Sequence, residues 1–385
     1  MRFPEFKGEW EETTLGKCVT QPLDYGMNAA AIAYDGENKY IRITDIDEQS
    51  SQYISDEPVS PAGQLLDKYI VKENDILFAR TGASTGKTYL YKKKDGKLYF
   101  AGFLIRAKIK TEYNSAFIFA QTKTVQYYKW VEFMSIRSGQ PGINSQEYAS
   151  YKFLIPQKEE QDKIATLFSL LDHRILIQSK IIEDLKVLQD SLIDYYYRLQ
   201  RYDKSVLLID CISQISERNK KNNAFPVLSV SNKYGFIQQI EQFENRKIAS
   251  EDISNYKIVR KNDFAYNPAR INVGSIAKLI KYSNGIVSPM YICFRAKDNF
   301  SPDFLEFYFK SKQFKNEVLK RLEGSVRQCL PFEGLCDIPV VFPPKEKQKD
   351  IITQLSAIQT KIEIETTIKE LLLKQKQHLL RQMFI

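Results

Sequence analysis

The chain contains the stretch Ile155-Pro156-Gln157-Lys158-Glu159-Glu160-Gln161 and repeats it in its last part as Phe342-Pro343-Pro344-Lys345-Glu346-Lys347-Gln348. The match then continues without a gap to the end of the chain. Loops accumulate insertions and deletions more readily than helices do, so an ungapped match of this length predicts one continuous helix after each proline. The identical pairs include Ile164/Ile351, Thr166/Thr353, Ser169/Ser356, Ile175/Ile362, Ile177/Ile364, Ile181/Ile368, Glu183/Glu370, Leu185/Leu372 and Leu192/Leu379.

The apolar spacing after the first proline agrees with a long helix. Seven positions follow a coiled-coil seam: Ile164, Leu167, Leu171, Ile181, Leu185, Leu188 and Leu192. Proline before each segment is a helix start signal, and neither glycine nor proline occurs in 158–202 or 345–385. About 38 helical residues would span roughly 57 Å, which is the length of a spacer.

Polar residues interrupt both seams at the same level. These are Arg174 and Gln178 in the first copy and Lys361 and Glu365 in the second. If the helices pair antiparallel about a pseudo-twofold axis, these residues meet near the middle and fix the register. Simple exposure of all four side chains explains the pattern equally well.

The segments before the two helices also repeat, but loosely. Leu15–Gln21 resembles Leu208–Gln214, Ile70–Asp75 resembles Ile258–Asp263, and Gly86 and Gly274 keep the latter offset. Short β-branched and aromatic runs bounded by turn residues predict strands at 40–43, 75–78, 103–105, 227–230 and 291–294, while 115–128 and 301–322 are expected to be helical. We therefore expect a mixed α/β fold with modules at 1–155 and 203–342 and long antiparallel coiled-coil helices at 156–202 and 343–385.

Charge favours a polyanionic partner. The net charge is +9, and 87–110 carries eight basic residues against Asp95, while 256–282 carries six against Asp263. Basic runs at matching places in a repeat favour phosphate contacts over a merely solvated face. No stretch reaches the length of a membrane span, the N-terminus lacks the apolar core of a secretion signal, and the five cysteines form no C-x-x-C pair. These features predict a cytoplasmic protein with no membrane partner and no metal site.

Motifs for catalysis are incomplete. Gly82–Thr88 is one residue short of a phosphate-binding P-loop, because Thr81 stands where that motif needs glycine. Asn267-Pro268-Ala269-Arg270 lacks the second proline and the aromatic residue of an amino-methyltransferase motif. His173 and His378 lie within the long helices, where ordinary surface roles are expected. The sequence therefore predicts a chain that catalyses no reaction.

The order of module, proline-led helix, second module and second proline-led helix resembles the specificity subunit of type I restriction–modification systems. The resemblance covers essentially the whole chain and includes the phrases Trp10–Gly16, Asn74–Lys87 and Asn262–Arg270. It implies two target-recognition domains, each reading half of a bipartite, asymmetric double-stranded DNA site, with the helices fixing the spacer. It also implies two modification subunits that bind S-adenosylmethionine and two restriction subunits that use ATP and Mg²⁺ in host defence, with no cofactor in this chain.

Arginine and lysine read guanine, and asparagine and glutamine read adenine, through paired hydrogen bonds in the major groove. Loops with these side chains follow strands in both modules. For the hydroxyl residues among them, a turn-forming role is the stronger expectation. The candidate DNA-binding residues are Arg80, Thr81, Ser84, Thr85, Lys87, Lys92, Lys93, Lys94, Arg137, Ser138 and Gln140 in the first module, and Asn267, Arg270, Asn272, Arg327 and Gln328 in the second.

Two other functions are compatible with the same sequence. A coiled-coil adaptor would bind protein through both modules, and a detached specificity part would belong to a combined restriction–modification enzyme. The mirrored basic runs and polar loops favour DNA over the adaptor. An adaptor would show no sequence preference in a DNA-binding experiment.

Overall fold

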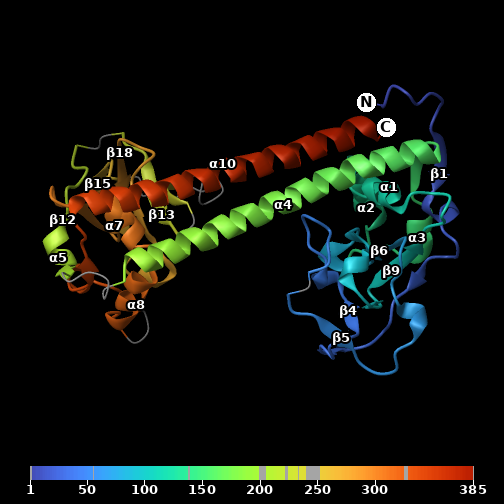
Figure 1. Ribbon diagram of the computed structural model, residues 1–385, viewed down its shortest axis with the longest axis horizontal. Helices are drawn as coiled ribbons and strands as arrows, with labels where there is room; N and C mark the ends of the chain where they lie inside the picture. The colour runs from blue at the N-terminus through green and yellow to red at the C-terminus, as the bar shows by residue number, and fades with distance from the viewer. Residues whose placement is uncertain are drawn as a thin grey trace. The chain divides into compact units, whose positions relative to one another are not determined.

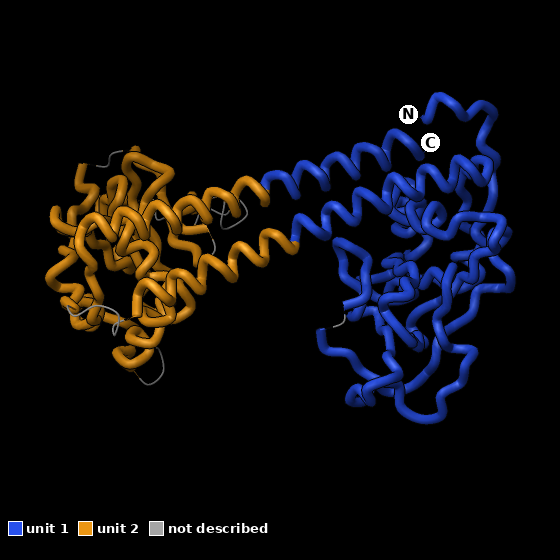
Figure 2. The backbone as a smooth tube through the Cα atoms, in the orientation of Figure 1, with its two compact units in different colours: residues 1–179, 367–385 blue, residues 180–366 orange. Residues whose placement is uncertain are grey.

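The computed structural model describes residues 2–54, 56–137, 139–198, 205–221, 224–232, 234–239, 252–324 and 328–384. The chain forms two compact units (Figures 1 and 2). Unit 1 comprises residues 1–179 and 367–385, and unit 2 comprises residues 180–366. Each unit holds one of the two modules together with part of each long helix, and each is described by itself below.

Two uninterrupted helices follow the two prolines, as the repeat predicts. They are α4 (Lys158–Tyr196) and α10 (Lys345–Met383), and each has 39 residues. In unit 1, Asp172 of α4 faces Lys376 of α10; in unit 2, Gln189 of α4 donates to Gln359 of α10 at 3.2 Å. Gln189 follows Asp172 on α4 by the same number of residues as Gln359 precedes Lys376 on α10. The helices therefore pair antiparallel with the same register in both units.

The buried seam of α4 differs from the predicted one in its second half. Ile164 and Leu171 are buried as expected, but Ile181 and Leu188 are exposed. Alternating steps of four and three residues from Leu171 arrive instead at Ile182 and Gln189, and both are buried. The prediction was wrong by one residue at Ile181 and Leu188, because an apolar neighbour of the true seam position was chosen there, whereas Leu185 and Leu192 lie on the stepped seam and are partly buried.

The polar interruptions were predicted in part. Gln178 and Glu365 are buried, whereas Arg174 and Lys361 are exposed. Lys361 forms an ion pair with Glu365 at 2.5 Å, so the buried carboxylate has a partner on its own helix. One polar residue of each predicted pair thus lies in the seam and the other lies outside it.

Module 1 is built around a four-stranded antiparallel sheet in the order β2-β9-β6-β7. A two-stranded sheet, β1-β10, joins its start to its end, and two further pairs, β3-β5 and β4-β8, add a lobe of their own. The elements are β1 (Glu11–Thr14), β2 (Asp24–Tyr25), β3 (Ala31–Ala33), β4 (Lys39–Ile41), β5 (Val59–Pro61), β6 (Asp75–Ala79), β7 (Thr88–Leu90), β8 (Leu98–Phe100), β9 (Leu104–Lys108), α1 (Ser115–Gln121), α2 (Val125–Met134), α3 (Ser145–Ala149) and β10 (Lys152–Ile155).

Module 2 repeats the four-stranded sheet in the order β12-β19-β16-β17 and the joining pair as β11-β20. Its own addition is a second four-stranded sheet, β14-β13-β18-β15. The elements are β11 (Ser205–Leu207), α5 (Leu208–Cys211), β12 (Ile212–Ile215), β13 (Val227–Ser231), β14 (Gly235–Gln238), β15 (Lys257–Arg260), β16 (Phe264–Tyr266), β17 (Ile276–Lys278), β18 (Asn284–Val287), β19 (Ile292–Ala296), α7 (Pro302–Tyr308), α8 (Lys312–Lys320), α9 (Phe332–Cys336) and β20 (Pro339–Val341). The mixed α/β fold expected for both modules is thus observed.

Backbone bonds repeat between the modules at the places where the sequence repeats. Asn74 and Asn262 both adopt a positive φ, at 69° and 71°, in the turn before β6 and β16. The following carboxylates, Asp75 and Asp263, accept from backbone N–H groups three residues earlier at 2.8 and 2.7 Å. The two spans expected to be helical are each split in two, because Thr124 and Ser311 cap a second helix.

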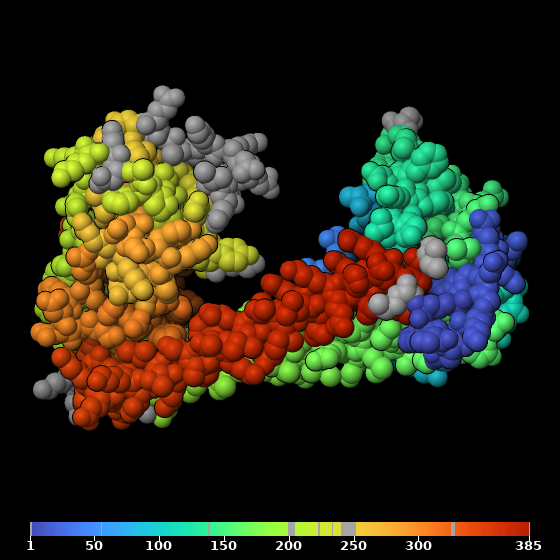
Figure 3. Space-filling model, turned by 90° about the horizontal axis from the view of Figure 1, so that it is seen from above, coloured from blue at the N-terminus to red at the C-terminus, as the bar shows by residue number. Residues whose placement is uncertain are grey.

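The far end of each long helix completes a module core. In unit 1, Phe384 packs on Phe117 with ring centroids 5.3 Å apart, and in unit 2 Tyr197 packs on Phe304 at 4.7 Å. The offset that relates the two helix-start prolines also relates Tyr197 to Phe384 and Phe117 to Phe304, so the two contacts are equivalent. The N-terminal residues also lie against these helix ends in unit 1, where Arg2 binds Glu160 (Figure 3). None of the helices within the described residues has the length and apolar character needed to cross a bilayer.

Candidate nucleic-acid interface

The two polar loops predicted in module 1 lie side by side. Backbone bonds join them at three points: Ile143 N–H donates to Arg80 at 2.9 Å, Gly82 N–H donates to Pro141 at 2.9 Å, and Thr81 pairs with Gly142. Segments 80–87 and 137–144 therefore form one surface, which we name loop platform 1. A pairing of this kind holds several side chains at fixed spacing, as base recognition requires.

Among the candidates on loop platform 1, Arg80 has the most available guanidinium. Its guanidinium lies 4.9 Å from the centre of the Tyr25 ring, and the Tyr25 hydroxyl accepts from the backbone N–H of Ser145. Among the described residues the guanidinium has no acidic partner. A stacked arginine with free N–H groups is suited to a bidentate contact with guanine.

Arg137 is held differently. It bonds both carboxylate oxygens of Glu147 at 2.6 and 2.7 Å and donates to the carbonyls of Met134 and Ile136. Glu147 in turn caps α3 together with Asn144. Arg137 therefore has to leave a satisfied network before it can contact a base, which makes it a weaker candidate than Arg80.

Some of the remaining candidates of loop platform 1 bond to the protein's own backbone, and others are wholly or partly exposed. Thr85 donates its hydroxyl to the Gly82 carbonyl at 2.7 Å, the turn-forming role expected for hydroxyl residues. Lys87 is largely covered and donates to the Ile46 carbonyl at 3.1 Å. Gln140 is exposed beside Gly82, while Ser84 and Thr81 are half-buried. Ser138 lies outside the described residues.

Module 2 builds an equivalent surface from 267–275 and from the described residues 323–324 and 328–330, named here loop platform 2. Leu330 N–H donates to Pro268 at 3.0 Å, and Glu323 and Cys329 exchange two backbone bonds. Asn267 is buried and accepts from Ala269 N–H at 3.1 Å, a turn role. The exposed candidates Arg270, Asn272 and Gln328 lie on the same pair of segments. Arg327 lies outside the described residues.

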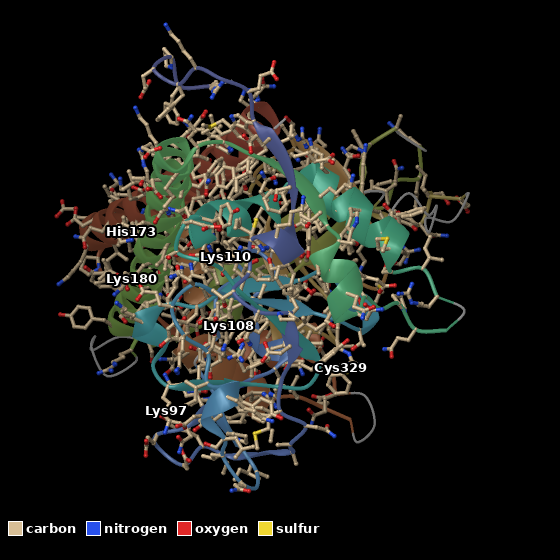
Figure 4. All side chains as sticks on the ribbon, turned by 90° about the vertical axis from the view of Figure 1, so that its right-hand side faces the viewer. Lys97, Lys108, Lys110, His173, Lys180 and Cys329 are labelled. Atoms are coloured by element: carbon tan, nitrogen blue, oxygen red, sulfur yellow. The ribbon has the colours of Figure 1, made fainter. Side chains whose placement is uncertain are left out.

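Several basic residues of the two runs are already paired with acidic side chains, so fewer of them are available to bind phosphate than their number suggests. Lys93 pairs with Glu73 at 2.9 Å and Lys97 with Glu37 at 3.2 Å. Arg106, counted in the first run, is buried and bonds Asp24, so it is not a phosphate contact. Figure 4 shows Lys97 well apart from Lys108 and Lys110, so the run does not form one patch.

An arginine–carboxylate pair at the start of each central strand escaped the sequence analysis; the pair is buried in module 1, whereas only the carboxylate is buried in module 2. Arg106 donates to the carbonyls of Ile70 and Lys68 and lies 3.6 Å from Asp75, and burial raises the pKa of Asp75 to about 6. In module 2, Arg295 bonds Asp263 at 2.6 Å. Both carboxylates stand at the start of the strand that leads into the loop, Asp75 as the first residue of β6 and Asp263 directly before β16. The matching Asn-Asp dipeptides were the available signal.

Features that could indicate catalysis remain unsupported. Gly82–Ser84 forms a single 3-10 turn and leads into strand β7, whereas a P-loop leads into a helix. His173 and His378 are exposed on α4 and α10, and Figure 4 shows His173 on the outer side of α4. Within the described residues no group of His, Cys, Asp and Glu side chains is arranged to hold a metal ion.

The profile of the type I restriction modification DNA specificity domain matches this chain twice, at residues 9–187 and 209–374. The chain belongs to this family. Each matched segment contains one module and most of the long helix that follows it. The specificity-subunit assignment expected from the resemblance is therefore confirmed, and the adaptor is not favoured.

Relatives of the specificity family extend over nearly the whole chain. A type I restriction enzyme MjaVIII specificity subunit from Methanocaldococcus jannaschii is 22% identical over 364 residues, covering 86% of this chain and 83% of the relative. The solved S subunit of a type I restriction–modification system from M. genitalium has a TM-score of 0.61 at 15% identity and covers 100% of this chain and 99% of that one. A chain from a structural study of complex assembly and conformational transition in a type I system has a TM-score of 0.58 at 14% identity, covering 98% and 97%. These solved structures show the same fold.

Proposed function

We propose that this specificity subunit reads a bipartite DNA site, one half through loop platform 1 and the other half through loop platform 2. The observation that carries the proposal is that an equivalent backbone bond joins the two segments of each platform while the exposed side chains of the platforms differ. Ile143 N–H to Arg80 in module 1 corresponds to Leu330 N–H to Pro268 in module 2. Two modules that recognise different DNA sequences are expected to share the backbone of the loops and to differ in the exposed side chains.

The leading base readers in this proposal are Arg80 in module 1 and Arg270 in module 2. Arg80 is held by Tyr25, and Arg270 is exposed at the start of a short 3-10 helix that ends at Gly274. Neither has an acidic partner among the described residues. Gln140, Asn272 and Gln328 are exposed amides on the same platforms and are suited to adenine.

The long helices would then serve as the spacer and as the docking site for partners. In this proposal two modification subunits dock on the helices and carry S-adenosylmethionine, and two restriction subunits use ATP and Mg²⁺. The chain itself would hold no cofactor and would work in the cytoplasm. Exposed apolar side chains on α4, including Leu170, Ile177 and Leu188, support docking along this helix.

The test is selection of duplexes from a random library by the chain coexpressed with its modification subunit. The wild-type chain should select two short motifs separated by a fixed nonspecific spacer. Arg80→Ala should relax one base position in one motif, and Arg270→Ala should relax one position in the other, each by about 1–3 kcal/mol. Arg218→Ala, an exposed arginine outside both platforms, is the control and should leave both motifs intact.

Selection of no motif by the wild-type complex would refute the proposal, and an adaptor would give that result. Relaxation of the same motif by both variants would refute the assignment of one platform to each half-site. A single-chain enzyme that combines specificity with modification would methylate DNA without the coexpressed subunit. The proposal predicts no methylation by this chain alone.

A further inference from the structure

A group of lysines gathers in unit 1 where module 1 meets the long helices. The group comprises Lys92 and Lys94 after β7, Lys123 between α1 and α2, and Lys376 of α10, and we name it the module 1 lysine cluster. Among the described residues, Asp172 of α4 pairs with Lys376 and acts on Lys92 and Lys123, and Asp95 also acts on Lys92. The loop platforms do not include Lys123 or Lys376.

Lys123 is the innermost member of the module 1 lysine cluster. Its ammonium donates to the Ser51 hydroxyl at 2.7 Å and to the Thr88 hydroxyl at 2.6 Å. Its third N–H has no acceptor among the described residues. Ser51 is a non-glycine residue with φ at 54°, a strained conformation that places its hydroxyl beside the amine. Neutral hydroxyls satisfy hydrogen bonds but leave the charge uncompensated.

The outer members are also short of counter-charge. The Lys92 ammonium has no hydrogen bond or ion pair with any described residue, although the Lys92 carbonyl accepts from the backbone N–H of Asp95 at 2.9 Å. Lys94 reaches only the amide oxygen of Gln52 at 3.5 Å. With Lys376 bound to Asp172 and with Asp95 acting on Lys92, the group holds two more positive charges than negative ones when Lys123 is protonated. An excess of this size at one place attracts a multivalent anion.

The electrostatics of Lys123 and Lys92 agree with this geometry. Burial lowers the pKa of Lys123 to about 7, and repulsion from Lys376 adds to the shift while Asp172 opposes it. Burial of the Lys92 amine, and then repulsion from Lys94, also lowers the pKa of Lys92. An anion placed between these amines would raise both pKa values by stabilising the charged form.

Module 2 has a carboxylate where module 1 has an aromatic ring. Lys310 occupies the place of Lys123 in the repeat, and Glu306 occupies the place of Phe119. Lys310 pairs with Glu306 at 3.3 Å, whereas Lys123 lies 4.4 Å from the centre of the Phe119 ring. The long helices also differ in charge at this level: Asp172 of unit 1 corresponds by the repeat to Gln359 of unit 2, and Lys376 corresponds to Gln189. Module 2 therefore supplies its own counter-charge at this level.

The corresponding groove of module 2 is open but balanced. It forms a cavity of about 1110 Å³ within unit 2 between β17, α7 and the helix pair. Lys278 lines it and is held by Asp303 and Glu306. Acidic and basic side chains both line this cavity, and two of its lysines, Lys278 and Lys310, are already paired with carboxylates.

We propose that the module 1 lysine cluster is a phosphate site that holds one phosphodiester of the DNA beside the sequence-reading surface. A phosphate oxygen would accept from the third N–H of Lys123 and from Lys92, and the Ser51 hydroxyl would complete its shell, while the buried Thr88 hydroxyl continues to hold Lys123. The contact carries no base information, so it positions the duplex in module 1 alone. This inference rests on the proposed DNA binding and adds an asymmetric backbone anchor to it.

Lysine variants give the first test, measured by DNA binding of the coexpressed complex at several salt concentrations. Lys92→Met and Lys123→Met should weaken cognate and random duplexes by the same factor. Each lost phosphate contact should lower the salt slope by about 1, so that weakening between roughly 50 and 200 mM salt shrinks about threefold. Lys310→Met, the matched control in module 2, should leave the slope unchanged.

A variant that keeps every lysine gives a sharper test. Phe119→Glu should install in module 1 the internal carboxylate that Glu306 provides in module 2, and should reduce the salt slope as Lys123→Met does. Phe119→Gln introduces a polar side chain of the same size as glutamate but without its charge, and it should retain the wild-type salt slope. Equal slopes in Phe119→Glu and wild type would overturn the proposal.

Chemical labelling separates failure of the site from failure of DNA recognition. Acylation of Lys123 in the full chain, followed by mass spectrometry, should slow severalfold relative to Lys310 when cognate duplex is added. Inorganic phosphate alone at high concentration should protect in the same direction if the cluster accepts free phosphate. Protection by phosphate without any DNA binding would refute the proposed function and retain the site. Sequence-specific DNA binding without protection of Lys123 would overturn the site and retain the function.

Discussion

Modules 1 and 2 share a frame down to single hydrogen bonds, yet they treat charge in opposite ways. Asp75 and Asp263 accept the same backbone bond in the same turn, and Asn74 and Asn262 adopt the same positive φ before them. Lys123, by contrast, is surrounded by hydroxyls, while its counterpart Lys310 has a carboxylate. Positions that fix the backbone are alike, and positions that meet solvent or a partner differ.

The buried ion pair of the frame offers the largest expected difference between the modules. The Arg106 side chain is 2% exposed and serves two carboxylates and two carbonyls, whereas the Arg295 side chain is 47% exposed. Arg106→Met should cost about 3–5 kcal/mol, because buried groups lose their partner. Arg295→Met should cost about 1–3 kcal/mol, because it removes a largely exposed side chain and leaves only one buried carboxylate, Asp263, without that partner.

Hydrogen exchange resolved by peptide is the suitable measurement, since it assigns the loss to one unit. Arg106→Met should accelerate exchange in β6 and β9 and leave β16 and β19 unaffected. Equal losses in the two variants would contradict the idea that burial sets the size of the effect.

The next largest expected difference in stability between the modules concerns two equivalent glycines. Gly86 and Gly274 have nearly the same φ, at 88° and 86°, but a Cβ on Gly86 would meet Val131 at 2.5 Å while one on Gly274 has no neighbour nearer than 3.9 Å. Gly274→Ala should cost about 1–2 kcal/mol through backbone strain alone. Gly86→Ala adds overpacking of about 1–3 kcal/mol. Denaturant midpoints for both variants check this, and a larger loss in Gly274→Ala would show that the backbone of module 1 adjusts.

The sequence predicted the parts of the fold that repeat or have a period. The two helices, the central strands and the paired loops all followed from residues such as Pro156 and Pro343 or from the Asn-Asp turns. The sequence did not predict contacts between residues that lie far apart in the chain. The contact of Arg80 with Tyr25 and the ion pair of Arg106 with Asp24 leave no local sequence signal. Glu147 was recoverable, because Asn144-x-x-Glu147 is a capping box.

The seam error has a related cause. Ile181 and Ile182 are equally apolar, so composition alone does not say which faces α10; the step pattern from Leu171 does. The candidate site was predictable as two loops, but the contribution of each side chain depends on its partners. Arg80 and Arg137 look equivalent in sequence, and only their neighbours distinguish a stacked arginine from one bonded to Glu147.

The pH dependence of stability should separate the lysines of the two modules. Burial lowers the pKa of Lys123 to about 7, so the folded chain binds fewer protons than the unfolded chain between pH 7 and the usual lysine value of about 10.4. Stability from this group therefore rises with pH over that window. Lys123→Met should be more stable than wild type at pH 6 to 7, and the advantage should narrow toward pH 9.5.

Lys278 should behave in the opposite way. Burial lowers its pKa, but attraction to Glu306 and Asp303 outweighs burial and raises it overall. The stabilising pair is then fully charged throughout pH 6 to 9.5, and Lys278→Met should be less stable than wild type across that range. Denaturant midpoints at four pH values test both variants. A Lys123→Met advantage that does not vary with pH would contradict the assigned charge state.

The smallest expected effect concerns the helix pair itself. Asp172 with Lys376 in unit 1 corresponds by the repeat to Gln359 with Gln189 in unit 2, so one position carries a charged pair and its counterpart an amide pair. Both side chains of the charged pair are partly exposed, and replacement by the amides of unit 2 in Asp172→Gln/Lys376→Gln should change stability by only about 0–1 kcal/mol. Lys376→Gln alone leaves Asp172 without its partner, and Asp172→Gln alone leaves Lys376 among the other lysines. A double-mutant cycle should therefore show the second single variant to be the more damaging, because it adds repulsion to the loss of the pair. The reverse order would mean that the lysines of module 1 are better screened than their geometry implies.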